Sequence, residues 1–181
     1  ANKTRPLEFE NAFGFKYKGR WDRAVDITEC VLFNDKLILL LEAIRTWAKE
    51  ENLDYYDQRK HTGVLRHLMV REGKNTGEEI VVLFVTDDFN EKTFVSAVEK
   101  VLPNAHIMAA VNNGLADTAA PESLRVLKGK DHIFEKIILT DEKGNKEREV
   151  TFTLSPQSFF QTNTLTAQKM YSRVRSIVKK I

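Results

Sequence analysis

The most apolar stretch of the sequence reads Ile80-Val81-Val82-Leu83-Phe84-Val85. Its residues are hydrophobic without interruption, and most of them are β-branched. This pattern is typical of a strand that is buried on both faces, because a strand with one wet face alternates between apolar and polar residues. We therefore expect a buried strand over residues 79–86.

A second strand is expected just before it, over residues 64–71, and two glycines lie in the stretch between the strands. This second strand carries Arg66, His67 and Arg71 among its apolar residues. At least one of its faces should therefore meet water or a ligand.

Two amphipathic helices should accompany these strands. The first begins with Asn34 as the expected N-cap and continues at helical spacing to about Glu51. The second begins at Asn90, and Pro103 stops it. A short strand over residues 106–111 follows, so the order is strand, strand, helix, strand.

The C-terminal third predicts a loop, a hairpin and a helix. Residues 112–122 are rich in small and turn-forming residues, as surface loops are. Apolar residues then alternate over 133–139 and 150–154, on either side of the turn sequence Asp-Glu-Lys-Gly-Asn at 141–145.

The last helix should begin with Asn163 or Thr164 as its cap. Its apolar stripe comprises Ala167, Met170, Tyr171, Val174, Ile177, Val178 and Ile181. Because a stripe of this length needs a surface to bury it, we expect the chain to be a segment of a larger protein.

The composition is that of a folded water-soluble protein, with 42% hydrophobic and 30% charged residues and a net charge of +2. This charge is too small to indicate nucleic-acid binding by itself. No apolar run approaches the ~20 residues of a membrane span, and the first residues lack a secretory signal. The expected location is the cytoplasm.

Common chemical signatures are missing from the sequence. The glycines never take the spacing of a nucleotide-binding loop, and no Gly-x-Ser-x-Gly turn or metal-binding histidine pair occurs. The one cysteine, Cys30, cannot form an internal disulfide or, alone, a zinc site.

Three blocks carry more information than the composition. The first is Ser155-Pro156-Gln157-Ser158-Phe159-Phe160-Gln161-Thr162-Asn163, followed by Ala167 and Tyr171. The second is Thr62-Gly63-Val64-Leu65-Arg66-His67-Leu68-Met69-Val70-Arg71-Glu72-Gly73, with Thr76-Gly77-Glu78. The third is Gly14-Phe15, with Val25-Asp26-Ile27-Thr28-Glu29-Cys30. Taken in their order along the chain, the three blocks resemble the RNA uracil-5-methyltransferase family.

The resemblance implies an S-adenosylmethionine-dependent enzyme that methylates carbon 5 of uridine in structured RNA, with ribosomal RNA preferred to transfer RNA. Residues 1–154 would form a central, RNA-facing α+β domain, with a mixed or antiparallel sheet and two to three packed helices. Residues 155–181 would begin the methyltransferase domain with its first helix. Neither DNA nor a membrane is expected as a partner.

The family's chemistry implies a cysteine thiolate that attacks C6 of uracil, methyl transfer to C5, and a carboxylate base that removes the C5 proton. The nucleophile, the base and the glycine-rich cofactor loop would all follow the last helix. We therefore expect the segment alone to be inactive, with no catalytic residue of its own.

The resemblance implies that residues of the first block bind the cofactor and the substrate. Gln161 should bind S-adenosylmethionine through its amide, and Phe159 should face the flipped uracil. The alternative is that Phe159 and Phe160 fill a core and that Gln161 caps a helix.

The other candidate residues come from the remaining two blocks. Arg66, His67 and Arg71 are expected to contact RNA, since basic residues on a strand suit phosphate positioning, although ordinary surface charge is an equal alternative. Cys30 matches the last of four cysteines that hold an iron–sulfur cluster in many relatives. It is either such a ligand in the parent protein or simply a buried cysteine.

A competing function is a non-catalytic RNA-binding or adaptor domain. Sequence downstream of residue 181 would decide, because the enzyme needs a cysteine-bearing, glycine-rich methyltransferase domain there.

Overall fold

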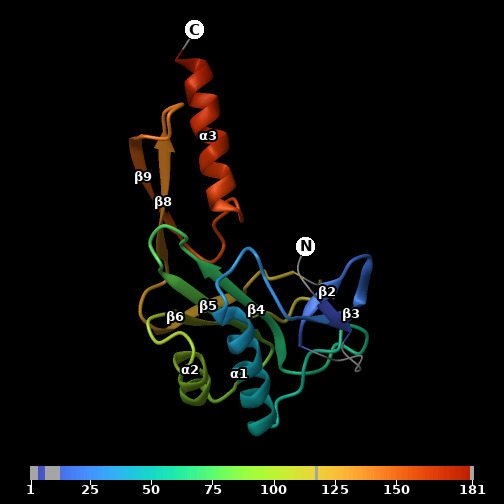
Figure 1. Ribbon diagram of the computed structural model, residues 1–181. Coiled ribbons are helices and arrows are strands. Elements are labelled where there is room, and N and C mark those ends of the chain that lie inside the picture. The colour runs from blue at the N-terminus through green and yellow to red at the C-terminus, as the bar shows by residue number, and fades with distance from the viewer. Residues whose placement is uncertain (1–3, 7–12, 117, 180–181) are drawn as a thin grey trace.

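The computed structural model describes residues 4–6, 13–116 and 118–179, and Ile181 of the expected apolar stripe lies outside them. Within the described residues the chain forms three helices and three sheets. Figure 1 shows a lower body, which holds a sheet and two helices, and an upper arm made of a hairpin and the last helix. We call these two parts the body and the arm.

A four-stranded mixed sheet lies at the centre of the body, in the order β4-β5-β6-β7. Its strands are β4 (Leu65–Glu72), β5 (Glu79–Val85), β6 (His106–Val111) and β7 (Ser123–Lys128). Every residue of β5 is buried, so the expected buried strand is confirmed. β5 and β6 run parallel because a helix connects them, and the other pairs are antiparallel.

Helices α1 (Lys36–Glu50) and α2 (Glu91–Glu99) cover one face of this sheet (Figure 1). They are joined to each other where the indole N–H of Trp47 donates to the hydroxyl of Thr93 at 2.9 Å. Helix α2 begins where it was expected, and Asn90 caps it through a hydrogen bond from the Thr93 N–H.

The cap expected for α1 is wrong by one residue. Asp35 occupies the N-cap position without a capping bond from its side chain. The side-chain oxygen of Asn34 instead accepts the N–H of Lys36, two residues on, which is an Asx-type turn before the helix.

The opposite face of the sheet carries a second hydrophobic cluster. It contains Ile80, Val82, Phe84, Met108 and Ala110 from the sheet, and Ile133 and Leu154 from the hairpin. The hairpin formed by β8 (Ile133–Thr140) and β9 (Lys146–Leu154) therefore starts and ends against the sheet and then leaves it.

The tip of the hairpin follows the expected turn. The carboxylate of Asp141 accepts the N–H groups of Lys143 and Asn145. Gly144 has φ of +87°, a backbone conformation that side chains other than glycine rarely adopt.

A small three-stranded sheet, which was not expected from the sequence, packs beside α1. Its strands are β1 (Thr4–Pro6), β2 (Phe15–Tyr17) and β3 (Arg20–Ile27), in the order β1-β3-β2. Arg45 of α1 joins it to the body by a 2.7 Å ion pair with buried Asp26 and by hydrogen bonds to the carbonyl of Phe13.

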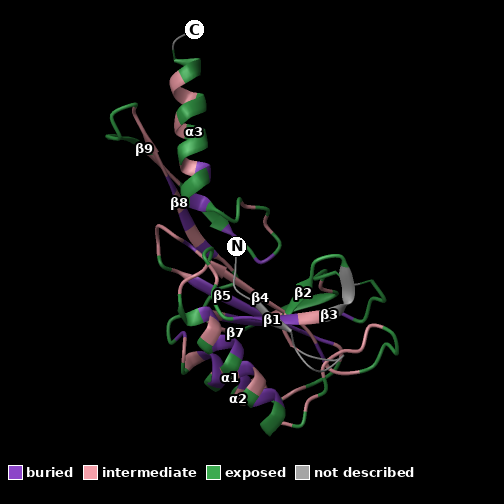
Figure 2. Ribbon diagram, turned by 45° about the vertical axis from the view of Figure 1, so that its right-hand side comes forward, coloured by how far each residue is buried: buried purple, intermediate pink, exposed green. Residues whose placement is uncertain are grey.

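Helix α3 (Thr164–Val178) lies along the hairpin, with Asn163 as its N-cap. It contacts the hairpin through a polar stripe made of Thr164, Gln168, Ser172 and Ser176, which we call the α3 polar stripe. Most of its apolar residues remain exposed, as Val174 does at 53%. Figure 2 shows burial only near the N-terminal end of this helix.

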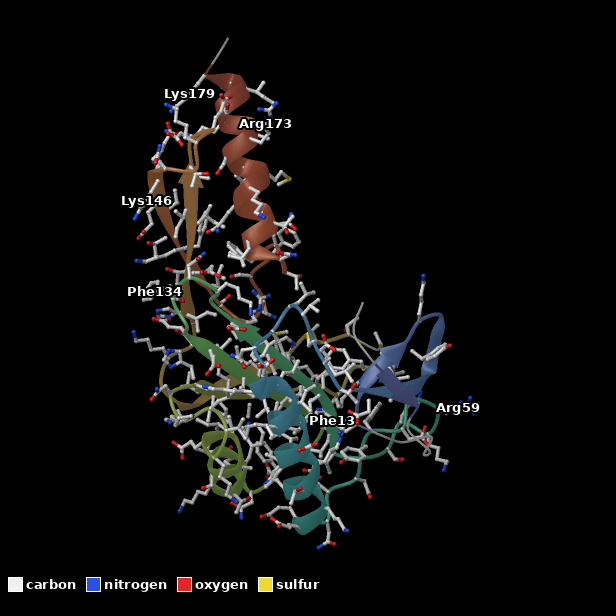
Figure 3. The ribbon with its side chains drawn as sticks, viewed as in Figure 1. Phe13, Arg59, Phe134, Lys146, Arg173 and Lys179 are labelled. Atoms are coloured by element: carbon white, nitrogen blue, oxygen red, sulfur yellow. The ribbon has the colours of Figure 1, made fainter. Side chains whose placement is uncertain are left out.

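Figure 3 places Lys146, Arg173 and Lys179 at the far end of the arm, and Phe134 at its base. Among the described residues, no helix is long and apolar enough to span a bilayer.

Candidate functional site

The turn over residues 155–163 connects β9 to α3, and both of its ends are held. At its start, Ser155 and Ser158 bond each other: the N–H of Ser158 donates to the Ser155 carbonyl, and the N–H of Ser155 donates to the Ser158 hydroxyl, each at 3.1 Å. Pro156 is buried. At its end, the side chain of Asn163 accepts the N–H of Thr166 at 3.0 Å and so begins the helix. A turn fixed in this way can hold a side chain in place for a ligand.

The two phenylalanines of this turn have different environments. Phe160 packs against the second cluster and makes an edge contact with Phe152, at 5.5 Å between ring centroids. Phe159 is 85% exposed. The core-filling alternative therefore holds for Phe160. The ring of Phe159 packs in no cluster of the described residues, and its contact with uracil stays a prediction.

Gln161 is exposed, and within the described residues its side chain has no hydrogen-bond partner. The capping alternative for Gln161 is wrong, because Asn163 takes that role. The amide of Gln161 therefore keeps its two donors and its acceptor available. Its contact with a cofactor remains a prediction.

The side chains of strand β4 alternate between the two faces of the sheet. Leu68 and Val70 pack with the cluster on the helix side, and Met69 packs with the cluster on the other side. Because side chains alternate along a strand, His67 and Arg71 share the face of Met69. The ring contact between His67 and Phe84, 6.0 Å between centroids, agrees with this placement.

The structure thus brings two candidate groups to one face of the sheet. Arg71 pairs in register with Ile80, and Ile80 belongs to the cluster against which Phe160 packs. Partial burial lowers the pKa of Arg71 from its usual value, but a guanidinium stays charged at neutral pH. Arg71 therefore offers a fixed positive charge on the face where the turn docks.

Arg66 has a structural role that the sequence did not reveal. It sits at a register shift between Leu65 and His67, and its guanidinium lies 4.2 Å from the centre of the Tyr56 ring. The same guanidinium donates to oxygens of the loop after β6, namely the carbonyls of Asn112, Gly114 and Ala116 and the side chain of Asn112. Most of its donors are therefore engaged, and its contact with RNA stays a prediction.

Comparison with known proteins identifies the family. No family model matches the chain. An RNA methyltransferase of Clostridium tetani is 30% identical over 170 residues, which are 91% of this chain and 35% of that protein. A tRNA (uracil(54)-C(5))-methyltransferase of Pyrococcus furiosus is 30% identical over 169 residues, 93% of this chain and 38% of that protein. The chain belongs to the RNA uracil-5-methyltransferase family.

A solved structure agrees with the fold. The tRNA (uracil-54, C5)-methyltransferase of Pyrococcus abyssi, in complex with S-adenosyl-L-homocysteine, matches with a TM-score of 0.67 and 24% identity. The match covers 90% of this chain and 37% of that one. The α+β fold is thereby confirmed, and the chain spans about a third of the length of its relatives in the RNA uracil-5-methyltransferase family.

The residues of this chain cannot hold an iron–sulfur cluster by themselves, and the role of Cys30 as one ligand in the parent protein stays a prediction. Cys30 is the only cysteine in the sequence, whereas a cluster normally needs four thiolates. Cys30 is half-buried beside Ile27, Leu37 and Leu41. Among the described residues, no group of three or more metal-binding side chains occurs.

A buried glutamate near the turn was not predicted from the sequence. Glu135 is 1% exposed and shares the inward side of β8 with Ile133 and Ile137. The signal was present, since Glu135 stands where the alternation of apolar residues calls for a core residue. Two of its hydrogen-bond donors are backbone N–H groups about 60 residues away, which no local pattern predicts.

Proposed function

We propose that the chain is a segment of a longer S-adenosylmethionine-dependent enzyme that methylates carbon 5 of uridine in RNA. Residues to Leu154 would form its RNA-facing domain, and Ser155 would begin its methyltransferase domain. One observation carries the proposal: the turn that the family signature covers exposes Phe159 and Gln161 while its two ends are held.

The cofactor assignment rests on Gln161. S-adenosylmethionine would supply the methyl group when it is bound. The amide of Gln161 has no partner within the described residues, so it can donate to or accept from a polar ligand without breaking an existing bond. The relative from Pyrococcus abyssi, which binds S-adenosyl-L-homocysteine, supports the same cofactor here.

The RNA assignment rests on one aromatic ring and one face of the sheet. An exposed ring such as that of Phe159 can stack on a base, which contributes about 1–3 kcal/mol per base. Arg71 and His67, on the face where the turn docks, would contact the backbone of the same RNA, because phosphate contacts fix the register of a nucleic acid.

The remaining chemistry would come from outside this chain. A pyrimidine C5 becomes nucleophilic only after a thiolate has added to C6, and the proton at C5 must then leave. Cys30 is a poor candidate for that thiolate because it packs against Ile27, Leu37 and Leu41, in the cluster beside α1. This chain would therefore bind and orient the reactants.

Methyl transfer by the full-length protein tests the proposal. The protein is incubated with methyl-labelled S-adenosylmethionine and unmodified ribosomal or transfer RNA, and the RNA is digested to nucleosides. The proposal predicts labelled 5-methyluridine in at least one RNA, and none with residues 1–181 alone. RNA binding without any methyl transfer would instead support the adaptor alternative. The two Pyrococcus relatives are named as transfer RNA methyltransferases, whereas ribosomal RNA was the expectation from the sequence, so both RNAs are assayed.

A further inference from the structure

A short turn between β4 and β5, residues 73–78, lies against the start of β8 at the base of the arm (Figure 1). The hydroxyl of Thr76 donates to the carbonyl of Phe134 at 2.6 Å, and the N–H of Phe134 donates to Glu78 at 2.7 Å. The approach is close enough to require glycine at position 73, where a Cβ would lie 2.7 Å from the carbonyl oxygen of Phe134. We call this segment the 73–78 turn.

Glu135 receives four donors at this junction. Its carboxylate accepts the backbone N–H groups of Lys74 at 2.6 Å, of Asn75 at 3.0 Å and of Lys136 at 2.7 Å. The hydroxyl of Thr164, the first residue of α3, donates to it at 3.3 Å. A buried carboxylate without such donors would be costly, but here its two oxygens are fully matched.

Asn75 makes the second link between the 73–78 turn and α3. Its side-chain amide donates to the carbonyl of Lys136 at 2.6 Å and to the side-chain oxygen of Gln168 at 2.7 Å. That oxygen of Gln168 also accepts the N–H of Ile138. Because a backbone N–H can only donate, Gln168 presents oxygen here, and Asn75 must present its NH₂ group.

These contacts fix where the 155–163 turn lies. Its first end leaves β9 at Leu154, which is buried against the sheet. Its other end is held through Thr164 and Gln168 by Glu135 and Asn75. Hydrogen bonds are directional, so a fully satisfied buried network specifies one arrangement more sharply than apolar contact does.

We infer that Glu135 and Asn75 are positioning residues, which hold Gln161 and Phe159 in a fixed position relative to the face of the four-stranded sheet that carries Arg71. This inference rests on the proposed function, because it assigns the network to the placement of cofactor and RNA contacts. A binding group must be held to within about 0.5 Å for full effect, so a loosened network weakens the site without unfolding the sheet.

The direction of the hydrogen bonds supplies a matched pair of variants in the full-length protein. Asn75→Asp removes both donors and sets a carboxylate against two acceptor oxygens. Gln168→Glu keeps an oxygen for the donors of Asn75 and Ile138. The inference predicts faster hydrogen–deuterium exchange over residues 157–168 in Asn75→Asp and near-wild-type exchange there in Gln168→Glu. Exchange in β5 should stay unchanged in both.

Binding and kinetics then separate positioning from general stability. In Asn75→Asp, the KM for S-adenosylmethionine should rise on the order of tenfold and the Kd for RNA should rise as well, with kcat at saturating cofactor and RNA within about twofold of wild type. General destabilisation would lower kcat and leave KM unchanged.

If Asn75→Asp fails to fold, Thr164→Val and Thr164→Ser give the same comparison, because only serine keeps the hydroxyl. Equal exchange over residues 157–168 in the two members of a pair overturns the inference. If the wild type transfers no methyl group, the proposed function fails, and the exchange result still decides the positioning role.

Discussion

Gln168 accepts a hydrogen bond from the backbone N–H of Ile138 at 2.9 Å, and this contact attaches α3 to the open edge of β8. One turn later, Ser172 accepts the N–H of Thr140 at 3.0 Å. Four residues of a helix rise about 6 Å, and two residues of a strand rise about 6.6 Å. Side chains four residues apart on a helix can therefore accept hydrogen bonds from every second N–H group of a strand. The free edge of β8 is thereby closed to further strands.

Removal of one such acceptor should loosen the arm. Ser172→Ala leaves the N–H of Thr140 without its partner, at an expected cost of about 1 kcal/mol. Faster hydrogen exchange at Thr140 would show this. Ser176→Ala is the matched control, because its hydroxyl donates to Glu142 in an exposed contact. Equal effects of the two substitutions would contradict the edge-capping role.

The two arginines of β4 should give different phenotypes. Arg66→Ala removes the guanidinium that holds the loop carbonyls, so the free energy of unfolding should fall by roughly 1–3 kcal/mol. Arg71→Ala should leave stability nearly unchanged and reduce the salt dependence of RNA binding, by about 0.7 in the log–log slope for one lost phosphate contact. Thermal melts and RNA titrations at several salt concentrations measure both. An unchanged slope in Arg71→Ala would place the RNA elsewhere.

The adjacent phenylalanines provide a second contrast. Phe160→Ala should lower the melting temperature, because its ring packs on Phe152 and the second cluster. Phe159→Ala should leave the melting temperature unchanged and weaken RNA binding or turnover, by about 1–3 kcal/mol if the ring stacks on a base. If Phe159→Ala matches wild type in RNA binding and turnover, Phe159 does not contact the substrate.

Gln161→Ala in the full-length protein tests the cofactor contact. Loss of a hydrogen bond to S-adenosylmethionine should cost roughly 1–3 kcal/mol, or about 5- to 150-fold in affinity or turnover. Stability should change little, since the side chain is exposed and Asn163 caps the helix. Wild-type affinity and turnover in this variant would show that Gln161 has no ligand role.

The pattern of apolar residues, together with turn-forming residues, predicted the longer helices and strands. Strand β5, the helix capped by Asn90 and the hairpin around Asp141 all lie where apolar spacing and turn residues placed them. The N-terminal sheet was missed because β1 and β2 have three residues each, too few for a period to show. Strand β7 was missed because it lies at the sheet edge, with Leu124 and Val126 partly exposed.

Side-chain roles that depend on distant partners were harder to predict. The sequence of β4 identified Arg66 only as a basic residue among apolar ones. The carbonyl groups that accept its hydrogen bonds lie 46 to 50 residues later in the chain. The apolar stripe of α3 was correctly located, yet the helix docks through its polar stripe. Amphipathic spacing reports which residues are apolar, and it does not say which face meets a neighbour within this chain.

The central claim is methylation at carbon 5 of uridine, and the fate of the hydrogen on that carbon tests it most directly. The full-length protein is supplied with RNA that carries tritium at C5 of its uridines, and with methyl-labelled S-adenosylmethionine. Methylation at carbon 5 predicts tritium release to water only when the cofactor is present, in a one-to-one ratio with the methyl groups incorporated. Methyl incorporation without tritium release would place the reaction at another atom and contradict the account.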